Sequence, residues 1–136
     1  MEALVRAVES PTAGAIATFA GTVRDHHLGK QVAFLEYEGY ESMARSELMD
    51  VIEEAAGRWS ISGAAAHHRL GRLEIGDISI GLAVASAHRA PAFEALRYVI
   101  DELKVRVPVW KRETGPDGTH WIEGPELVPT RPEPAD

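Results

Sequence analysis

The sequence has 136 residues with a formal net charge of −7, 45% hydrophobic and 26% charged residues, which is typical of one globular domain and excludes a disordered chain. No apolar run approaches the ~20 residues that span a bilayer, and the N-terminus lacks a secretory signal, so we expect a cytoplasmic protein that does not bind membranes. Because the chain is acidic and has no cysteine, we expect neither nucleic-acid binding nor thiolate or disulfide chemistry.

The first half of the chain predicts a short helix, two strands and a long helix. Residues 2–9 can form a helix that the following Ser-Pro step ends, and the small apolar run 13–24 predicts a buried strand that bends near Gly21. Residues 32–40 alternate apolar and polar side chains, so we expect a strand that pairs with the first across a six-residue loop. Residues 41–59 repeat apolar side chains at helical spacing and predict an amphipathic helix.

The second half predicts two strands, a second helix and a final hairpin. Residues 63–71 and 78–87 are expected strands joined by a turn, and the second is apolar enough to lie in the centre of a sheet. Apolar spacing over residues 92–107 predicts an amphipathic helix, which Pro108 should end because it disfavours helical geometry in the residue before it. Two short strands around the sequence GPDG predict the hairpin.

This order of elements indicates an α+β fold of antiparallel hairpins with two packed amphipathic helices. We expect one catalytic domain over residues 1–124. Residues 125–136 contain four prolines in twelve residues and predict a flexible tail.

Basic residues gather within residues 103–113 of this acidic chain. The sequence contains three lysines in all, and two of them are Lys104 and Lys111. A purely structural explanation exists for Lys104 and Arg106, because cations are favoured near the C-terminus of a helix. Since Pro108 turns the chain out of the helix, however, the two lysines could converge on one cleft. The pattern leaves two interpretations open, a shared anion or catalytic site and a solvated basic patch.

Other candidate residues follow the predicted strands. His88 and Arg89 lie between a strand and a helix, where they could supplement backbone N–H groups that face an anion, although a helix cap is the alternative. Arg24 ends the first strand. The adjacent histidines at 26–27 and 67–68 would point to opposite faces of a strand, so we expect no metal site. Neither a phosphate-binding loop nor a nucleophile elbow is present.

Four segments, in this order and spacing, resemble the large catalytic subunit of molybdopterin synthase. They are FAGTVRDHHLGK at 19–30, LEYEGY at 35–40, SAHRAPAFEA at 86–95 and LKVRVPVWKRE at 103–113. The resemblance spans about residues 14–123 and implies an α/β hammerhead fold. It also implies a sulfurtransferase that converts cyclic pyranopterin monophosphate to molybdopterin in molybdenum cofactor biosynthesis, with no cofactor of its own.

The same resemblance implies the partners. The sulfur donor would be the C-terminal Gly-Gly thiocarboxylate of a small ubiquitin-like subunit, and two copies of this chain would form a homodimer within a heterotetramer. An arginine that reaches the neighbouring subunit's site in some members has no clear counterpart here, since Pro125 stands near its place and Arg131 is a possible substitute.

The resemblance also assigns roles to residues. Lys104 maps to the main catalytic group and Lys111 to a second catalytic lysine, because a fixed ammonium can stabilise negative charge that develops on oxygen. The resemblance implies that Phe19, Arg24, His88 and Arg89 bind the substrate, and we also expect Arg106, a neighbouring cation of the basic segment, among the substrate-binding residues.

Two alternatives stay open at this point. A non-catalytic module could hold a ubiquitin-like tail in the same basic groove, which predicts tight binding without product. An enzyme for another phosphorylated heterocycle would instead turn over without any protein sulfur donor.

Overall fold

The computed structural model describes residues 1–122, so the predicted tail, with Pro125 and Arg131, lies outside the described residues. Its helices are α1 (Glu2–Val8), α2 (Glu41–Arg58) and α3 (Arg89–Arg106). Its strands are β1 (Ala15–Thr22), β2 (His26–His27), β3 (Lys30–Gln31), β4 (Phe34–Gly39), β5 (Gly63–His68), β6 (Gly71–Glu74), β7 (Ile78–Ser86), β8 (Val109–Gly115) and β9 (Gly118–Ile122).

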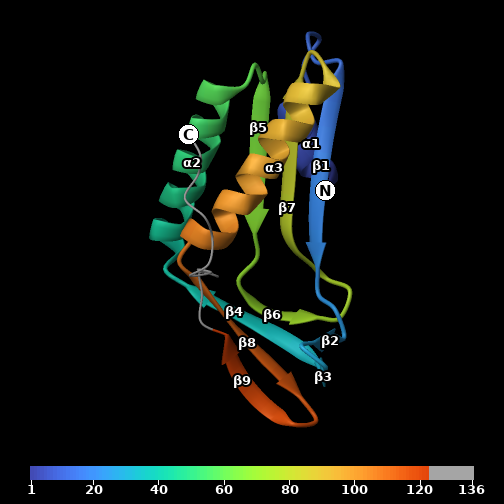
Figure 1. The fold of residues 1–136 in the computed structure, drawn as a ribbon, viewed down its shortest axis with the longest axis vertical. Coiled ribbons are helices and arrows are strands. Elements are labelled where there is room, and N and C mark those ends of the chain that lie inside the picture. Colours follow the sequence, from blue (N-terminus) through green and yellow to red (C-terminus); the bar gives the residue numbers. More distant parts are fainter. Residues whose placement is uncertain (123–136) are drawn as a thin grey trace.

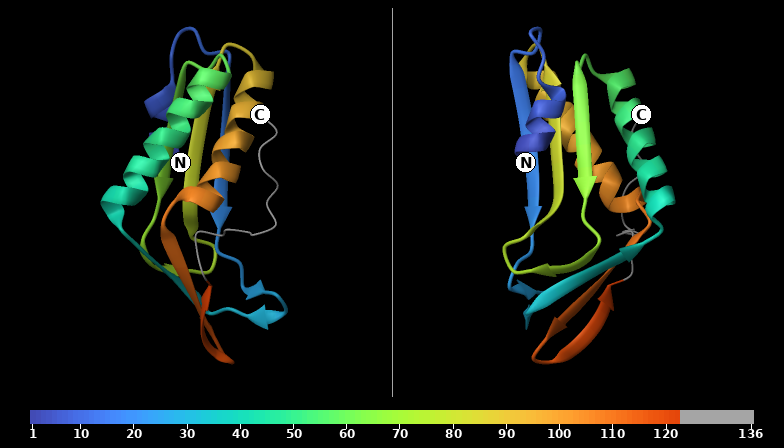
Figure 2. Two further views of the ribbon diagram at one scale, coloured as in Figure 1. Left: turned by 60° about the vertical axis from the view of Figure 1, so that its left-hand side comes forward. Right: turned by 180° about the vertical axis from the view of Figure 1, so that it is seen from behind.

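One layer of the molecule is an antiparallel sheet in the order β1-β7-β5, with α2 and α3 on one face and α1 on the other (Figures 1 and 2). Side chains of β7 alternate between these faces. Leu82 and Val84 pack in the main core with residues of α2 and α3, whereas Ala83 and Ala85 pack against Val8 of α1. Because both faces are covered, residues 80–85 of β7 are all apolar or glycine and buried, and β7 lies between β1 and β5, which confirms the prediction of a central strand.

A second antiparallel sheet, in the order β6-β4-β8-β9, lies at the end of α2 and α3 (Figure 1). It joins the helices directly, because β4 leads into α2 and β8 follows α3. Its small core consists of Val23, Val32, Leu35 and Leu73. Tyr37 packs against both this core and the main one, so it marks the junction of the two sheets.

The predicted pairing of residues 32–40 with the first strand is wrong. β1 pairs with β7 along its whole length, and β4 pairs with β6 and β8. The intervening loop forms its own small hairpin, β2–β3, which turns the chain away from β1 before β4 begins. β6 was not predicted as a strand, since most of it falls in the expected turn between the strands 63–71 and 78–87. Only Leu73 of its four residues is buried, and so short a segment shows no periodicity.

The remaining elements agree with the predictions. α3 ends at Arg106, and Val107 takes an extended conformation (φ −75°, ψ 125°) immediately before Pro108. The last two strands form the expected hairpin. The α+β class with antiparallel sheets is therefore confirmed. Within residues 1–122, every helix is too short or too polar to cross a bilayer.

Candidate active site

A cavity of about 140 Å³ lies where the two sheets and the end of α3 meet. Its wall combines residues of β1, β2, β4, β7, β8 and α3 with the segment that follows β1. The charged and titratable side chains of this wall are Arg24, His26, His27, Tyr37, Lys104, Lys111 and Glu113. The volume is below the roughly 300–1,000 Å³ of pockets that enclose a small molecule. One chain therefore offers room for a reacting group rather than for a whole heterocyclic substrate.

A bend in β1 brings Phe19 and Arg24 to the cavity. The pairing of β1 with β7 shifts register between Gly21 and Thr22, as the sequence predicted near this glycine. A side chain at Gly21 would meet the Phe19 ring, since a Cβ there would lie 3.2 Å from it. The Ser79 hydroxyl donates to the Gly21 carbonyl at 3.2 Å and stabilises the bend. A larger residue at this position would therefore require the Phe19 ring to shift by a few tenths of an ångström.

Lys104 and Lys111 reach the same cavity from different elements. Lys104 lies in the last turn of α3 and Lys111 lies on β8, and Pro108 makes the change of direction between them. The Lys111 side chain is 22% exposed. The structure thus brings together four of the predicted site residues, Phe19, Arg24 and the two lysines.

His68 lies behind this wall, where its ring meets Tyr37 edge to face at 4.9 Å between centroids. Burial lowers the pKa of His68, and the positive charge of Lys104 acts in the same direction. A neutral imidazole is therefore favoured beside the lysine, which adds no further positive charge to that side of the site.

Glu113 is the one carboxylate in the described wall of the cavity, and it is almost fully buried. Its Oε2 lies 2.7 Å from His27 Nδ1 and 3.8 Å from Lys111 Nζ. Three basic side chains, Arg24 and the two lysines, therefore line the cavity with a single carboxylate. This excess of positive charge suits an anionic substrate or a reaction in which negative charge develops on oxygen.

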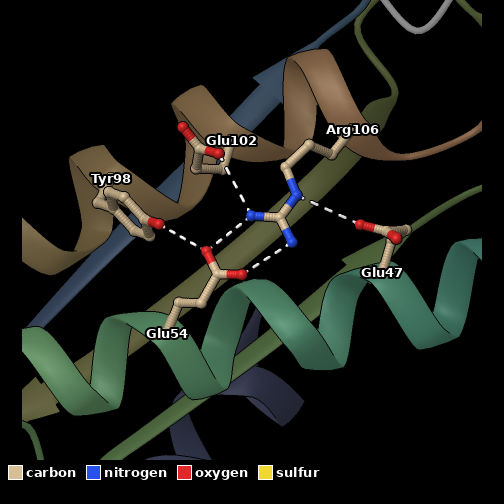
Figure 3. Close-up of polar contacts among 5 residues, drawn as sticks. All are labelled: Glu47, Glu54, Tyr98, Glu102 and Arg106. Atoms are coloured by element: carbon tan, nitrogen blue, oxygen red, sulfur yellow. Dashed lines mark hydrogen bonds and ion pairs between the residues drawn. The ribbon is translucent and has the colours of Figure 1, made fainter. Parts of the chain in front are cut away.

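Arg106 does not join the cavity wall among the described residues. It lies at the junction of α3 and α2 (Figure 3), where it donates to Glu54 from two nitrogens at 2.7 and 2.9 Å and also to Glu102 and Glu47. The hydrogen bonds that Glu54 accepts from Arg106, together with one from Tyr98, lower the pKa of Glu54 to about 2. The guanidinium is thus committed to holding two helices together, although the sequence suggested a substrate contact.

His88 and Arg89 lie at the opposite end of α3 from Lys104. Fifteen residues of helix separate Arg89 from Lys104, which corresponds to about 22 Å along the axis. The backbone N–H of His88 donates to Ser86 Oγ at 3.5 Å, and both side chains are exposed. Within one chain, the structure does not bring this pair to the cavity.

Several residues of the wall were not predicted. Tyr37 and Glu113 were not singled out, and His27 was considered only as a metal ligand. One available signal was the spacing of Lys111 and Glu113, because residues two apart on a strand point to the same face. Within residues 1–122, no group of three or more His, Cys, Asp or Glu side chains could hold a metal ion.

Comparisons with known proteins agree with this architecture. The model of the MoaE protein family matches residues 1–106. The molybdopterin synthase catalytic subunit of Pyrococcus abyssi is 44% identical over 131 residues, which cover 96% of this chain and 88% of that protein. The crystal structure of molybdopterin synthase from Staphylococcus aureus superposes with a TM-score of 0.82 at 36% identity, covering 86% of this chain and 85% of that one.

A more distant structure shares the fold. It is the complex of subunits 1 and 2 of molybdopterin-converting factor from Helicobacter pylori, with a TM-score of 0.69, 21% identity and coverage of 90% and 77% of the two chains.

Proposed function

We propose a function from the premise that this chain belongs to the MoaE family, as its match over residues 1–106 and its 44% identity to a molybdopterin synthase catalytic subunit establish. The chain acts as the catalytic subunit of a molybdopterin synthase, an enzyme of molybdenum cofactor biosynthesis. Its substrate is cyclic pyranopterin monophosphate, and the sulfur comes from the C-terminal thiocarboxylate of a small ubiquitin-like subunit. The absence of cysteine supports an external sulfur donor.

The convergence of Lys104 and Lys111 in one cavity is the observation that carries this proposal. Negative charge grows on oxygen when the thiocarboxylate sulfur bonds to substrate carbon and when water later releases the acyl group of the carrier. A fixed ammonium stabilises that charge, and a single donor of this kind contributes on the order of 10²–10³ in rate. Lys104 takes the main role and Lys111 the second.

Arg24 and Phe19 suit the other parts of the substrate. The planar guanidinium of Arg24 can donate two parallel hydrogen bonds to a phosphate. The ring of Phe19, which faces the cavity beside Gly21, can pack against a flat heterocycle.

A homodimer carrying one small subunit on each copy gives His88 and Arg89 a role. These side chains lie too far from the cavity of their own chain to contact a substrate bound there, and the cavity is too small to enclose one. A second copy can supply both the missing wall and the missing cations. The Helicobacter pylori complex, which holds two subunits of molybdopterin-converting factor, supports the presence of a partner subunit.

Reconstitution tests the proposed activity. Purified protein is mixed with cyclic pyranopterin monophosphate and a small subunit carrying either a thiocarboxylate or an ordinary carboxylate, and molybdopterin is assayed as its oxidised fluorescent derivative. We expect product only with the thiocarboxylate, and a loss of about 100-fold in Lys104→Ala. Lys30→Ala is the matched control, because Lys30 is the one lysine outside the cavity. Complex formation without product would instead leave a tail-binding module.

Mixing two inactive variants tests the proposed dimer. If Arg89 serves the neighbouring copy, a dimer of one Lys104→Ala chain and one Arg89→Ala chain has one intact site. We expect such mixtures to recover up to half of the wild-type turnover per mixed dimer, with a dimer seen in sedimentation. No recovery of turnover in verified mixed dimers would show that His88 and Arg89 do not contribute to the site of the neighbouring copy.

A further inference from the structure

Two basic groups approach the same oxygen of the buried Glu113. His27 Nδ1 lies 2.7 Å from Oε2, within hydrogen-bonding distance, whereas Lys111 Nζ lies 3.8 Å from it. An N–H···O hydrogen bond spans about 2.7–3.2 Å, so Lys111 forms an ion pair with Glu113 without donating a hydrogen bond to it. The donors of Lys111 are therefore not consumed by the carboxylate.

The imidazole donates in this contact. An ionised carboxylate only accepts hydrogen bonds, so Nδ1 of His27 must carry the hydrogen. This arrangement satisfies a buried acceptor that would otherwise need another donor. The other charged and titratable groups of the cavity wall are Arg24 just before β2, His26 on β2, Tyr37 on β4, Lys104 on α3 and Lys111 on β8. Lys111 shares a strand face with Glu113 and, with Nζ 3.8 Å from Oε2, can serve as a replacement donor.

The β2–β3 hairpin fixes His27 in this position. Its turn contains Leu28 and Gly29, which both have positive φ angles of 51° and 79°. On the other side, Gly115 of β8 lies so close to the Gln31 carbonyl that no Cβ could fit between them. The hairpin is thus held against β8 just beyond Glu113, and the imidazole has little freedom to leave.

We propose that His27 is a positioning residue. Its hydrogen bond to Glu113 satisfies the carboxylate and thereby keeps the Lys111 ammonium available to the substrate. The inference rests on the proposed function, in which Lys111 contacts reacting groups. Without the imidazole, Glu113 has an unsatisfied buried oxygen, and Lys111 moves the short distance needed to donate to it. The ammonium is then withdrawn from the cavity, and turnover falls although both catalytic lysines remain.

Lysine NMR tests this inference without any need for turnover. With ¹³Cε- and ¹⁵Nζ-labelled lysine, the chain gives three side-chain signals, which Lys30→Arg and Lys104→Arg assign. We expect His27→Ala to shift the Lys111 signal. The Lys30 signal is no reference for this variant, because Lys30 pairs directly with His27 in the hairpin. His27→Asn should keep the Lys111 signal near its wild-type position, because the asparagine amide can donate to Glu113 as Nδ1 does. An unchanged Lys111 signal in His27→Ala overturns the proposal.

Turnover supplies the second readout. We expect His27→Ala to lower kcat about tenfold, which is a typical coupling between residues in contact, and His27→Asn to restore most of it. Adding His27→Ala to Glu113→Gln should cost no more than Glu113→Gln alone, because the neutral amide no longer attracts the ammonium. Unfolding midpoints of all variants identify any that fail to fold, and His27→Asn remains informative in that case.

The two proposals fail in distinguishable ways. If wild-type protein makes no product, the proposed function fails while the Lys111 signal still reports on His27. If product forms but the losses in His27→Ala and Glu113→Gln multiply in the double variant, His27 acts independently of Glu113 and the positioning role is wrong.

Discussion

The cavity and the junction of α2 with α3 lie next to each other along the chain but use their cations in opposite ways. Lys104 and Lys111 face the cavity, where one carboxylate opposes them and Arg24. Arg106, only two residues after Lys104, is bonded to three glutamates, and Arg112 is bonded to one. A cluster of basic residues in the sequence thus divides into two lysines that face the cavity, for which we propose a catalytic role, and two arginines that are bonded to glutamates of neighbouring elements.

The chemistry of the side chains explains this division. A planar guanidinium donates to both oxygens of a carboxylate at once, as Arg106 does to Glu54, so arginine suits a fixed junction. An ammonium is a compact charge on a flexible stem, which suits a group that must meet charge as it develops. The Arg106 junction also holds the last turn of α3, which carries Lys104, against α2.

Removing Lys111 should have a large effect on turnover. We expect Lys111→Ala to lower turnover about 100-fold, because it removes one of two ammonium donors from the cavity. The unfolding midpoint should stay near that of wild type, since Glu113 keeps its hydrogen bond from His27. Steady-state kinetics and thermal unfolding, with Lys30→Ala as control, measure both. Turnover equal to that of Lys30→Ala would show that Lys111 is merely part of a basic patch.

Removing Arg106 should have the largest effect on the structural side. Arg106→Ala leaves Glu54 and the buried Glu102 without their guanidinium partner, so we expect the free energy of unfolding to fall by about 2 kcal/mol. Arg97→Ala is the control on the same helix, because its ion pair with Asp101 is largely exposed and should be worth less than about 0.5 kcal/mol. Urea unfolding compares them. Equal losses in the two variants contradict a special role for Arg106.

The same junction should depend on pH. The folded pKa of Glu54 is about 2, below its ordinary value of 4.5, so between these values the unfolded chain binds more protons. Its contribution to stability is therefore complete above pH 4.5 and is lost as the pH falls toward 2. Because the side chain is 40% exposed, screening reduces this contribution to about 1 kcal/mol.

Urea unfolding of wild type and Glu54→Gln at several pH values between 6 and 2.5 measures this contribution. The difference in stability between the two proteins should shrink as the pH falls. A difference that stays constant over this range would mean that the carboxylate does not stabilise the junction through its charge.

The smallest effect is expected at Arg112, whose partner Glu36 lies directly across the β4–β8 pair. Both side chains are 30% exposed, so we expect Arg112→Gln to cost about 0.5 kcal/mol of unfolding free energy and to leave turnover unchanged. Kinetics and urea unfolding of the same preparation give both values. A loss of turnover like that expected of Lys111→Ala would show that Arg112 also contributes to catalysis.

Much of the fold could be predicted from the sequence because its elements are local. Apolar spacing located α2 and α3, and Pro108 gave the end of α3. Strand partners depend on contacts between distant segments, so β4 was placed beside the wrong strand. The four-residue β6 was missed for lack of any repeating pattern.

The site could be predicted in part, because its motifs are local in sequence whereas its geometry depends on contacts between distant segments. Motifs indicated Phe19, Arg24 and the two lysines, which the structure places around one cavity. They gave no information on which end of α3 a residue would face, so His88 and Arg89 were grouped with residues about 22 Å away. Nor could they show that the guanidinium of Arg106 is already bonded to glutamates of α2, because that contact depends on how the helices pack.

A paired measurement on Lys104→Ala and Arg106→Ala tests the division of the basic segment most directly. Turnover and the free energy of unfolding are determined for both variants at a temperature where each is folded. We predict opposite outcomes, with Lys104→Ala losing about 100-fold in turnover at nearly unchanged stability, and Arg106→Ala losing about 2 kcal/mol of stability while keeping turnover within about tenfold. Full turnover in Lys104→Ala, or abolished turnover in a stably folded Arg106→Ala, would contradict the division.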